Sequence, residues 1–211
     1  MPAERRRGTG GRPTAAAAVR LETTILDRAT AAFLAHGYAA TTIEGIARDS
    51  GVAKRTIYAR WNGKPELFRA VMGRLLARWL SEAGDWAEAE ELEAALRIAA
   101  GRILAVALTP EAIALHRLLV AEGMRFPELP DMIRDAGATE GIARVAALLH
   151  RAVAQGVLPP QDTRYAAEQF IHLVLAGPQQ RALGLMPGFG EQEVHSWGEQ
   201  AVELFLRGAA R

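Results

Sequence analysis

A short run of basic and hydroxyl-bearing residues carries the clearest chemistry in the sequence. It contains Lys54, Arg55, Thr56, Tyr58 and Arg60. Lysine and arginine can neutralise phosphate groups, and hydroxyls can donate to phosphate oxygens or base edges. A guanidinium group can also make two parallel hydrogen bonds to guanine. On the outer face of a helix, this combination predicts a surface that contacts double-stranded DNA.

Two short helices joined by a glycine turn would position this run. The first would open with a T-x-x-E capping box, Thr41 with Glu44, and the second would follow Gly51 at about 53–61. Ala47 is small enough for the point where the two helices cross. This layout is typical of a helix-turn-helix, and the alternative is an ordinary helical hairpin with a solvated basic face. The apolar residues that would pin the two helices are Ile46, Val52 and Ile57.

Charge divides the chain into two unlike parts. Residues 1–80 carry 14 Lys and Arg against 6 Asp and Glu, whereas residues 81–211 carry 11 against 18. A basic module joined to an acidic one indicates a polyanion as partner for the first and a different partner for the second. Residues 1–14 are charged and rich in Gly and Pro, which predicts a flexible basic arm that either reaches the adjacent minor groove or is a plain solubilising tail.

Apolar periodicity predicts an all-α fold of about nine helices. Leu21, Ile25, Ala29 and Phe33 recur at four-residue spacing before Gly37, and a long helical run begins at Lys64. Further helices are expected at roughly 91–108, 110–123, 129–156, 162–184 and 190–207. A Gly-Pro pair at 177–178 should kink or split the helix that contains it. No segment alternates like a strand.

The composition argues against an enzyme, a metal site and a cofactor. Because the chain has no cysteine, it can form no disulfide framework, thiolate zinc site or cysteine nucleophile. It has no H-x-x-x-H pair, no G-x-S-x-G elbow and no phosphate-binding glycine loop. No stretch is long and apolar enough to span a membrane, so we expect a cytoplasmic protein. The five histidines are scattered: His36, His116, His150, His172 and His195.

Residues 25–71 resemble the N-terminal domain of TetR-family transcriptional regulators. The likeness runs from the A-H-G-Y exit of the first helix through T-T-I-x-x-I-A and G-V-x-K-x-T-I-Y to G-K-x-E-L. It implies phosphate contacts from Thr42, Tyr58 and Lys64. It also implies base-edge or phosphate contacts from Lys54, Arg55 and Thr56. Two residues depart from the family pattern: Ala53, which cannot cap the recognition helix, and Trp61, which replaces a smaller phenylalanine.

Residues 116–130, HRLLVAEGMRFPELP, resemble the AefR-like subgroup of that family. The resemblance implies a helix-turn-helix domain at 15–63 and a ligand-binding and dimerisation domain at 64–211. It places a pocket among helices four to seven and a dimer interface on helices eight and nine. The alternative for both sets of residues is packing inside the core. The pocket candidates are Met72, Leu76, Trp79, Trp86, Leu104, His116, Leu119, Met124, Phe170 and His172, and the interface candidates are Tyr165, Leu173, Val174, Val194, Trp197, Ala201 and Phe205.

Together these patterns predict a homodimeric DNA-binding transcriptional regulator, a repressor released from a palindromic operator by a small hydrophobic ligand. Two alternatives stay open: a DNA-binding regulator or architectural protein without small-molecule control, and a helical interaction adaptor. No metal, cofactor or membrane partner is expected.

Overall fold

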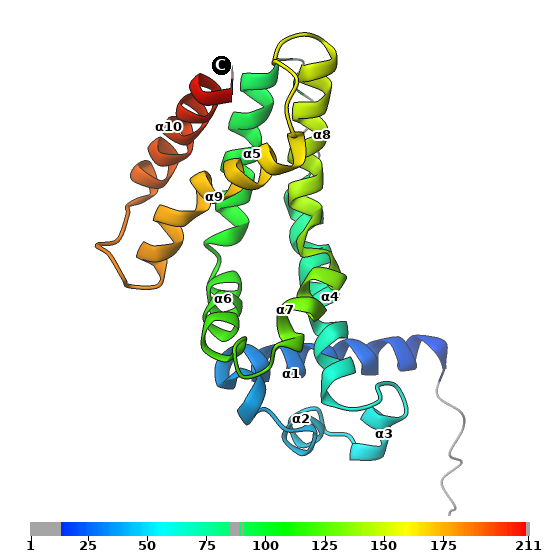
Figure 1. Cartoon of the computed structure of the whole chain (residues 1–211). Coiled ribbons are helices and arrows are strands. Elements are labelled where there is room, and N and C mark those ends of the chain that lie inside the picture. Colours follow the sequence, from blue (N-terminus) through cyan, green and yellow to red (C-terminus); the bar gives the residue numbers. More distant parts are fainter. Residues whose placement is uncertain (1–13, 85–88, 90, 210–211) are drawn as a thin grey trace, which may run out of the picture.

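The computed structural model describes residues 14–84, 89 and 91–209, and its regular secondary structure is entirely helical there (Figure 1). Except for Thr14, the predicted arm at 1–14 lies outside these residues. Within them the chain forms ten α-helices and one π-helical turn. The helices are α1 (Ala15–Ala40), α2 (Ile43–Asp49), α3 (Lys54–Tyr58), α4 (Lys64–Glu82), α5 (Leu92–Ala107), α6 (Pro110–Glu122), α7 (Glu128–Ile133), α8 (Glu140–Ala154), α9 (Thr163–Ala182) and α10 (Glu191–Ala209), with the π-helical turn η1 (Arg134–Ala138) before α8.

The first core joins α1, α2 and α3 to parts of the second half of the chain. The periodic residues of α1 pack inward, and Trp61 is buried as well. Aromatic rings form the centre, where Phe33, Tyr38 and Phe68 lie 5.0–5.9 Å apart between centroids. Leu115 of α6 and Leu129 of α7 belong to the same cluster. The helix-turn-helix therefore shares its core with α4, α6 and α7, across the domain limit expected at residue 63.

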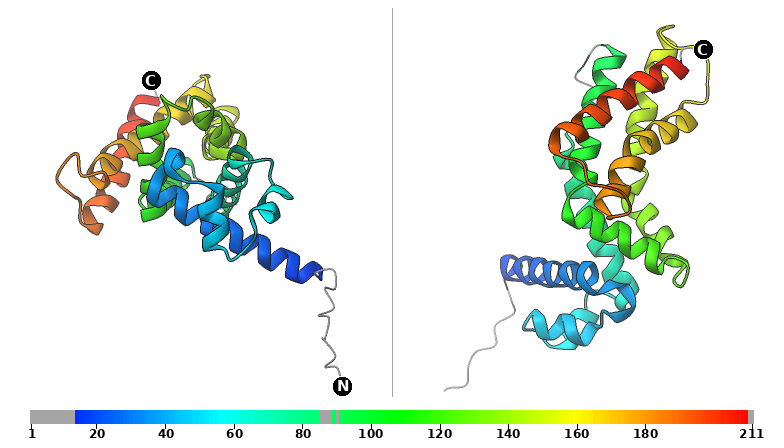
Figure 2. Two further views of the ribbon diagram at one scale, coloured as in Figure 1. Left: turned by 90° about the horizontal axis from the view of Figure 1, so that it is seen from below. Right: turned by 90° about the vertical axis from the view of Figure 1, so that its left-hand side faces the viewer.

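The second core lies at the opposite end of the molecule, among α5, α8, α9 and α10 (Figure 1). Its largest buried side chain, Phe170, meets Phe205 edge-on at 5.1 Å between α9 and α10. The long helix α4 rises from the helix-turn-helix beside α7 and α8, while α5 and α6 form the other limb. Figure 2 shows the same two ends from below and from the side.

The helix expected at 129–156 is divided in two, which raises the number of helices from about nine to ten. It breaks at Gly137, whose φ of 108° lies in the left-handed region that favours glycine. The break lets Met132 face the first core and Leu149 face the second.

The helix is not split at Gly177 and Pro178, where a kink or split was expected, because α9 continues from Thr163 to Ala182. Pro178 has no N–H for the carbonyl of Val174, and the indole Nε1 of Trp197 donates to that carbonyl at 3.0 Å instead. The indole lies so close to Gly177 that a Cβ there would overlap it. A side chain from α10 thus compensates for the proline inside α9.

Among the described residues, no individual helix is long and apolar enough to be a candidate membrane span. The pair α5 and α6 meets these criteria of length and composition only when the two are taken together, and the chain bends by 74° between them.

Candidate DNA-binding surface and its connections

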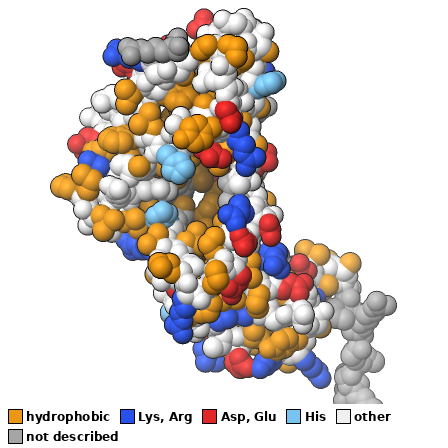
Figure 3. All heavy atoms as spheres, in the orientation of Figure 1, with side chains coloured by type: hydrophobic (Ala, Val, Ile, Leu, Met, Phe, Trp, Pro, Cys, Tyr) orange, Lys and Arg blue, Asp and Glu red, His pale blue; other side chains and the backbone are white. Residues whose placement is uncertain are grey.

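The residues predicted to contact DNA lie together at the α1–α3 end of the molecule. Lys54, Arg55 and Tyr58 are exposed on α3, and Tyr58 keeps 47% of its surface accessible. Thr56 and Arg60 are half-buried beside them. Figure 3 shows Lys and Arg side chains along this end of the visible face. The structure therefore brings the predicted basic residues onto one surface.

Ion pairs hold two of these basic side chains in place. Lys54 donates to the carboxylate of Glu44 on α2, and its Nζ lies 5.5 Å from the centre of the Tyr58 ring. The hydrogen bond raises the pKa of Lys54 and lowers the pKa of Glu44. Arg60 pairs with Glu22 of α1 at 4.0 Å. Lys54 thus stays positively charged while it links the two helices of the helix-turn-helix.

The capping box expected for α2 was placed one residue too early. Thr42, not Thr41, is the N-cap, and its hydroxyl accepts from the N–H of Gly45 at 3.1 Å. Thr41 is buried and donates its hydroxyl to the carbonyl of Gly37 at 2.7 Å. The T-x-x-E spacing fits Thr41 alone, because Gly45 stands three residues after Thr42, yet Thr42 is the hydroxyl residue that directly precedes the helix. As the sequence indicated, Ala53 provides no side-chain cap for α3.

Lys64, expected to bind phosphate, faces the backbone of its own chain. Its Nζ donates to the carbonyls of Tyr38 at 2.8 Å and Thr41 at 3.1 Å, and lies 3.4 Å from that of Ala39. It also sits 4.5 Å from the centre of the Tyr38 ring. Partial burial lowers the pKa of Lys64. The ammonium group therefore caps the end of α1 from the first residue of α4.

Sequence reasoning missed Glu122, the last residue of α6. Its two carboxylate oxygens accept from the backbone N–H groups of Tyr38 at 3.0 Å and Ala39 at 2.7 Å. The residue lies inside the 116–130 segment already noted, but its partners are more than 80 residues away in the chain. A local pattern carries no signal for a contact of that separation.

The predicted pocket residues fall into several environments. Met72 and Trp79 are buried in the first core, where Leu76 and Leu119 pack against it, and His116 is half-buried on α6. Leu104 and Phe170 belong to the second core. Trp86 lies outside the described residues.

Two of these candidates need correction. Met124 is 97% exposed at the turn after α6, so it faces solvent rather than a cavity. His172 is exposed on α9, with its Nδ1 2.7 Å from the carbonyl of Glu168. Helical spacing predicts which face of a helix a residue lies on, but it does not predict which neighbouring helix covers that face.

Several predicted interface residues are covered within the chain itself. Val174 and Ala201 are buried, and Trp197 packs over α9 as described above. Phe205 packs on Phe170. Val174 and Ala201 are core residues of the single chain, so the inward-facing alternative applies to them, whereas Trp197 and Phe205 are half-buried. The exposed remainder of the two helices includes Tyr165, at 60%, and Leu204, at 62%. Leu173 and Val194 are half-buried.

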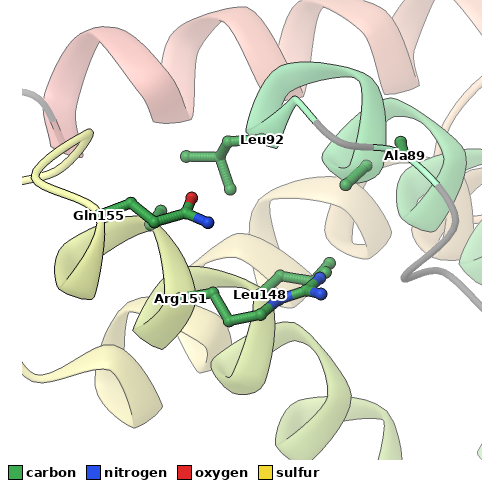
Figure 4. Close-up of a pocket in the computed structure, with 7 residues that line it drawn as sticks. Ala89, Leu92, Leu148, Arg151 and Gln155 are labelled. Atoms are coloured by element: carbon green, nitrogen blue, oxygen red, sulfur yellow. The ribbon is translucent and has the colours of Figure 1, made fainter.

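A cavity of about 480 Å³ lies among α1, α4 and α6, where Leu34 and Leu75 line it, and other cavities lie at the far end from the recognition surface. One of about 360 Å³ opens between α5 and α8, where Leu92 and Leu148 face Arg151 and Gln155 (Figure 4). Another of about 370 Å³ lies between α5 and α10, and Leu104 lines it. Figure 3 also shows a hollow at mid-height between the two limbs. No group of three or more His, Asp or Glu side chains in the described part of the chain could hold a metal ion.

The contacts of Lys64 lead to a test of its role in folding. We expect Lys64→Met to lower the free energy of unfolding by about 1–2 kcal/mol, because it removes charge-assisted hydrogen bonds from the end of α1. Urea denaturation would measure the change. Arg69→Met, which removes an exposed charge from the same helix, should shift the midpoint far less. Equal shifts for the two variants would contradict a capping role.

Comparisons with known proteins agree with this geometry. Residues 25–71 match the family of bacterial regulatory proteins called the tetR family, and residues 94–208 match the AefR-like transcriptional repressor C-terminal domain. The HTH-type transcriptional repressor ComR of Escherichia coli (strain K12) is 37% identical over 73 residues, which are 34% of this chain and 35% of ComR. This chain thus matches about a third of the length of ComR.

Solved structures share the fold over nearly the whole chain. A chain from Mesorhizobium loti MAFF303099, described as a TetR-family transcriptional regulator, is 27% identical with a TM-score of 0.76, covering 92% of this chain and 98% of that one. The flavonoid-responsive regulator FrrA is 29% identical with a TM-score of 0.74, covering 90% and 97%. The fatty acid degradation regulator FadR from Bacillus halodurans, at 19% identity and a TM-score of 0.69, shares the fold over 89% and 95%.

The family consists of DNA-binding transcription regulators rather than enzymes, in agreement with the basic surface on α3. The second match covers more than half of the chain. The chain therefore belongs to the TetR family of transcriptional regulators, with an N-terminal helix-turn-helix and an AefR-like C-terminal domain.

Proposed function

We propose that this regulator is a homodimeric repressor that binds a palindromic operator in the cytoplasm and leaves it when a small hydrophobic effector binds. The observation that carries the proposal is the outward display of Lys54, Arg55 and Tyr58 on a helix-turn-helix. The description of the matched C-terminal domain and of ComR as repressors supports repression. A two-fold dimer suits a palindrome because each recognition helix then reads one half-site.

On the recognition helix, Arg55 is the strongest candidate for reading base edges. It is exposed near the start of α3, where a helix entering the major groove points its side chains at the bases. Thr42 and Tyr58 would contact phosphates, with Thr56 and Arg60 at the margin. Lys64 would act there mainly by holding the end of α1, given its contacts with three carbonyls.

These roles separate affinity from sequence preference. We expect Arg55→Ala to lose about 1–3 kcal/mol of discrimination among sequences, whereas Tyr58→Phe weakens all sequences to a similar degree. Selection from random duplexes, followed by binding measurements over a range of salt concentrations, would give both quantities. Binding by the wild type should fall steeply with salt. A dependence of log affinity on log salt concentration with a slope near zero would contradict phosphate contact. If Arg55→Ala keeps the sequence preference of the wild type, residues other than Arg55 read the base edges.

For the effector we propose a site between α4 and α6, lined by Leu76, Trp79, His116 and Leu119. Trp79 is buried in the first core, Leu76 and Leu119 pack against it, and His116 is half-buried on α6. FrrA is described as flavonoid-responsive and is 29% identical to this chain, which supports a flat, largely apolar molecule as effector. His116 would be the polar anchor in that setting.

We expect a flavonoid aglycone to release the wild type from its operator in a fluorescence anisotropy titration. His116→Leu should require roughly tenfold more of the compound, because one oriented hydrogen bond is lost. His195→Leu, which changes an exposed histidine on α10, provides the control. If flavonoids and other small hydrophobic compounds leave the complex intact, the alternative of a regulator without small-molecule control is favoured.

The dimer would use the exposed sides of α9 and α10. Tyr165 and Leu204 are large hydrophobic residues with more than half of their surface accessible in the single chain. Pairing both helices with a second copy would bury them in a four-helix bundle. The interface proposed here thus lies on the outer faces, and excludes Val174 and Ala201, which the chain buries itself.

We expect Leu204→Glu to convert the dimer to a folded monomer, because it places a charge in the centre of that apolar contact. Sedimentation velocity at micromolar concentration would measure the change. Val120→Glu, at a similarly exposed valine on α6, should leave the dimer intact. A monomeric wild type that still binds a palindrome tightly would refute the dimer.

A further inference from the structure

The backbone segment 37–41, between α1 and the helix-turn-helix, is held from two sides by opposite charges. The carboxylate of Glu122 accepts from the N–H groups of Tyr38 and Ala39, and the ammonium of Lys64 donates to carbonyls of the same segment. Thr42, the N-cap of α2, follows directly. Any movement of this segment must therefore move the start of the helix-turn-helix.

Gly37 makes the approach of Glu122 possible. Its φ of 82° and ψ of 174° turn the chain out of the α1 helix and direct the next two N–H groups toward α6. A Cβ on this residue would overlap Oε1 of Glu122. Phe126, just beyond α6, also packs edge-on against Tyr38 at 5.2 Å between ring centroids. The end of α6 is thus fitted to this turn by hydrogen bonds, by shape and by ring packing.

The contact supplies a second attachment between the recognition unit and the rest of the molecule. The first attachment is α4, which continues covalently from the helix-turn-helix past α7 and η1 (Figure 1). A unit joined through one helix can still tilt about that helix. The second attachment is α6, which meets the recognition unit through Glu122 and through Leu115 and Leu118 of the first core and leads to α5, and α5 packs on α9 and α10. Two separate attachments fix an orientation that one leaves free.

We propose that Glu122 is a positioning residue that fixes the tilt of the helix-turn-helix relative to α5, α9 and α10, and so sets the half-site spacing that the dimer accepts. The statement on spacing rests on the dimer proposed above, whereas the statement on tilt concerns a single chain. One extra base pair moves a half-site by about 3.4 Å and turns it by roughly 35°. A dimer whose helix-turn-helix units have a fixed tilt binds the lengthened operator weakly, whereas a dimer whose units tilt freely binds both operators.

The tilt can be measured within one chain. Because the chain has no cysteine, Ala59→Cys beside α3 and Ala147→Cys on α8, both exposed, would carry two spin labels without further changes. Diluting the labelled chain with unlabelled chain restricts the signal to the intrachain distance. We expect one narrow distance distribution in the parent and a broader or shifted one after Glu122→Gln or Glu122→Ala. Glu93→Gln, which removes the same charge from an exposed pair on α5, should leave it unchanged.

The spacing is measured with operators whose half-sites are moved apart by one base pair. We expect the ratio of affinities for the preferred and the lengthened operator to fall about tenfold in Glu122→Gln, as the loss of one charge-assisted hydrogen bond would give. Binding to an isolated half-site should hardly change. A role confined to stability would weaken both operators equally and leave that ratio as it is.

The outcomes distinguish this inference from the function on which it rests. If the wild type binds operators of both spacings equally well, the palindrome-reading dimer is refuted and the role of Glu122 in spacing with it. The intrachain distance distribution would still test whether Glu122 fixes the tilt. A spacing-sensitive wild type whose Glu122 variants keep the distance distribution and the affinity ratio would overturn the inference alone. Should the variants fail to fold, hydrogen exchange in the wild type decides: unprotected amides at Tyr38 and Ala39 would overturn it.

Discussion

The arrangement of the molecule depends on how the chain leaves α1. Between Gly37 and Thr41 the backbone turns away from the helix, and its N–H and carbonyl groups would lack partners without outside help. The carboxylate of Glu122 accepts hydrogen bonds from the N–H groups, and the ammonium of Lys64 donates to carbonyls. Three segments that are distant in sequence therefore meet at one turn. The Tyr38 ring fills the space between them in the first core. This junction fixes where α2 begins, and α2 in turn contacts the recognition helix α3.

This arrangement explains why the helix-turn-helix is not an independent unit. With five residues and no side-chain cap, α3 is too short to be stable alone, and its burial of Ile57 against the shared core holds it. Parts of α4, α6 and α7 complete that core. A change in the packing of these helices therefore reaches the recognition surface through direct contacts, which is the physical basis that ligand control of DNA binding requires.

At the opposite end of the molecule, contacts from α10 and the loop before it stabilise α9 around Pro178. Pro178 would leave a carbonyl of α9 without a donor, and the Trp197 indole of α10 supplies one. Arg181 stacks on the Phe189 ring at 4.0 Å and donates to the carbonyl of Gly177, which closes the corner between the two helices. Trp197, Arg181 and Phe189 make these contacts within one chain. The outer faces of α9 and α10 are what the fold leaves available for association.

The sequence by itself determined what depends on neighbouring residues: the helical class, most helix limits, the helix-turn-helix and the basic face of α3. These features follow from periodicity, turns and charge, which act over a few residues. Only the tertiary structure decided what depends on distant partners. In the tertiary structure the cap of α2 is Thr42 instead of Thr41, and Lys64 donates to the backbone. Val174 and Ala201 are buried, whereas Met124 is exposed. Glu122 lies against the end of α1. Each of these required knowing which helix packs on which, and no local pattern contains that information.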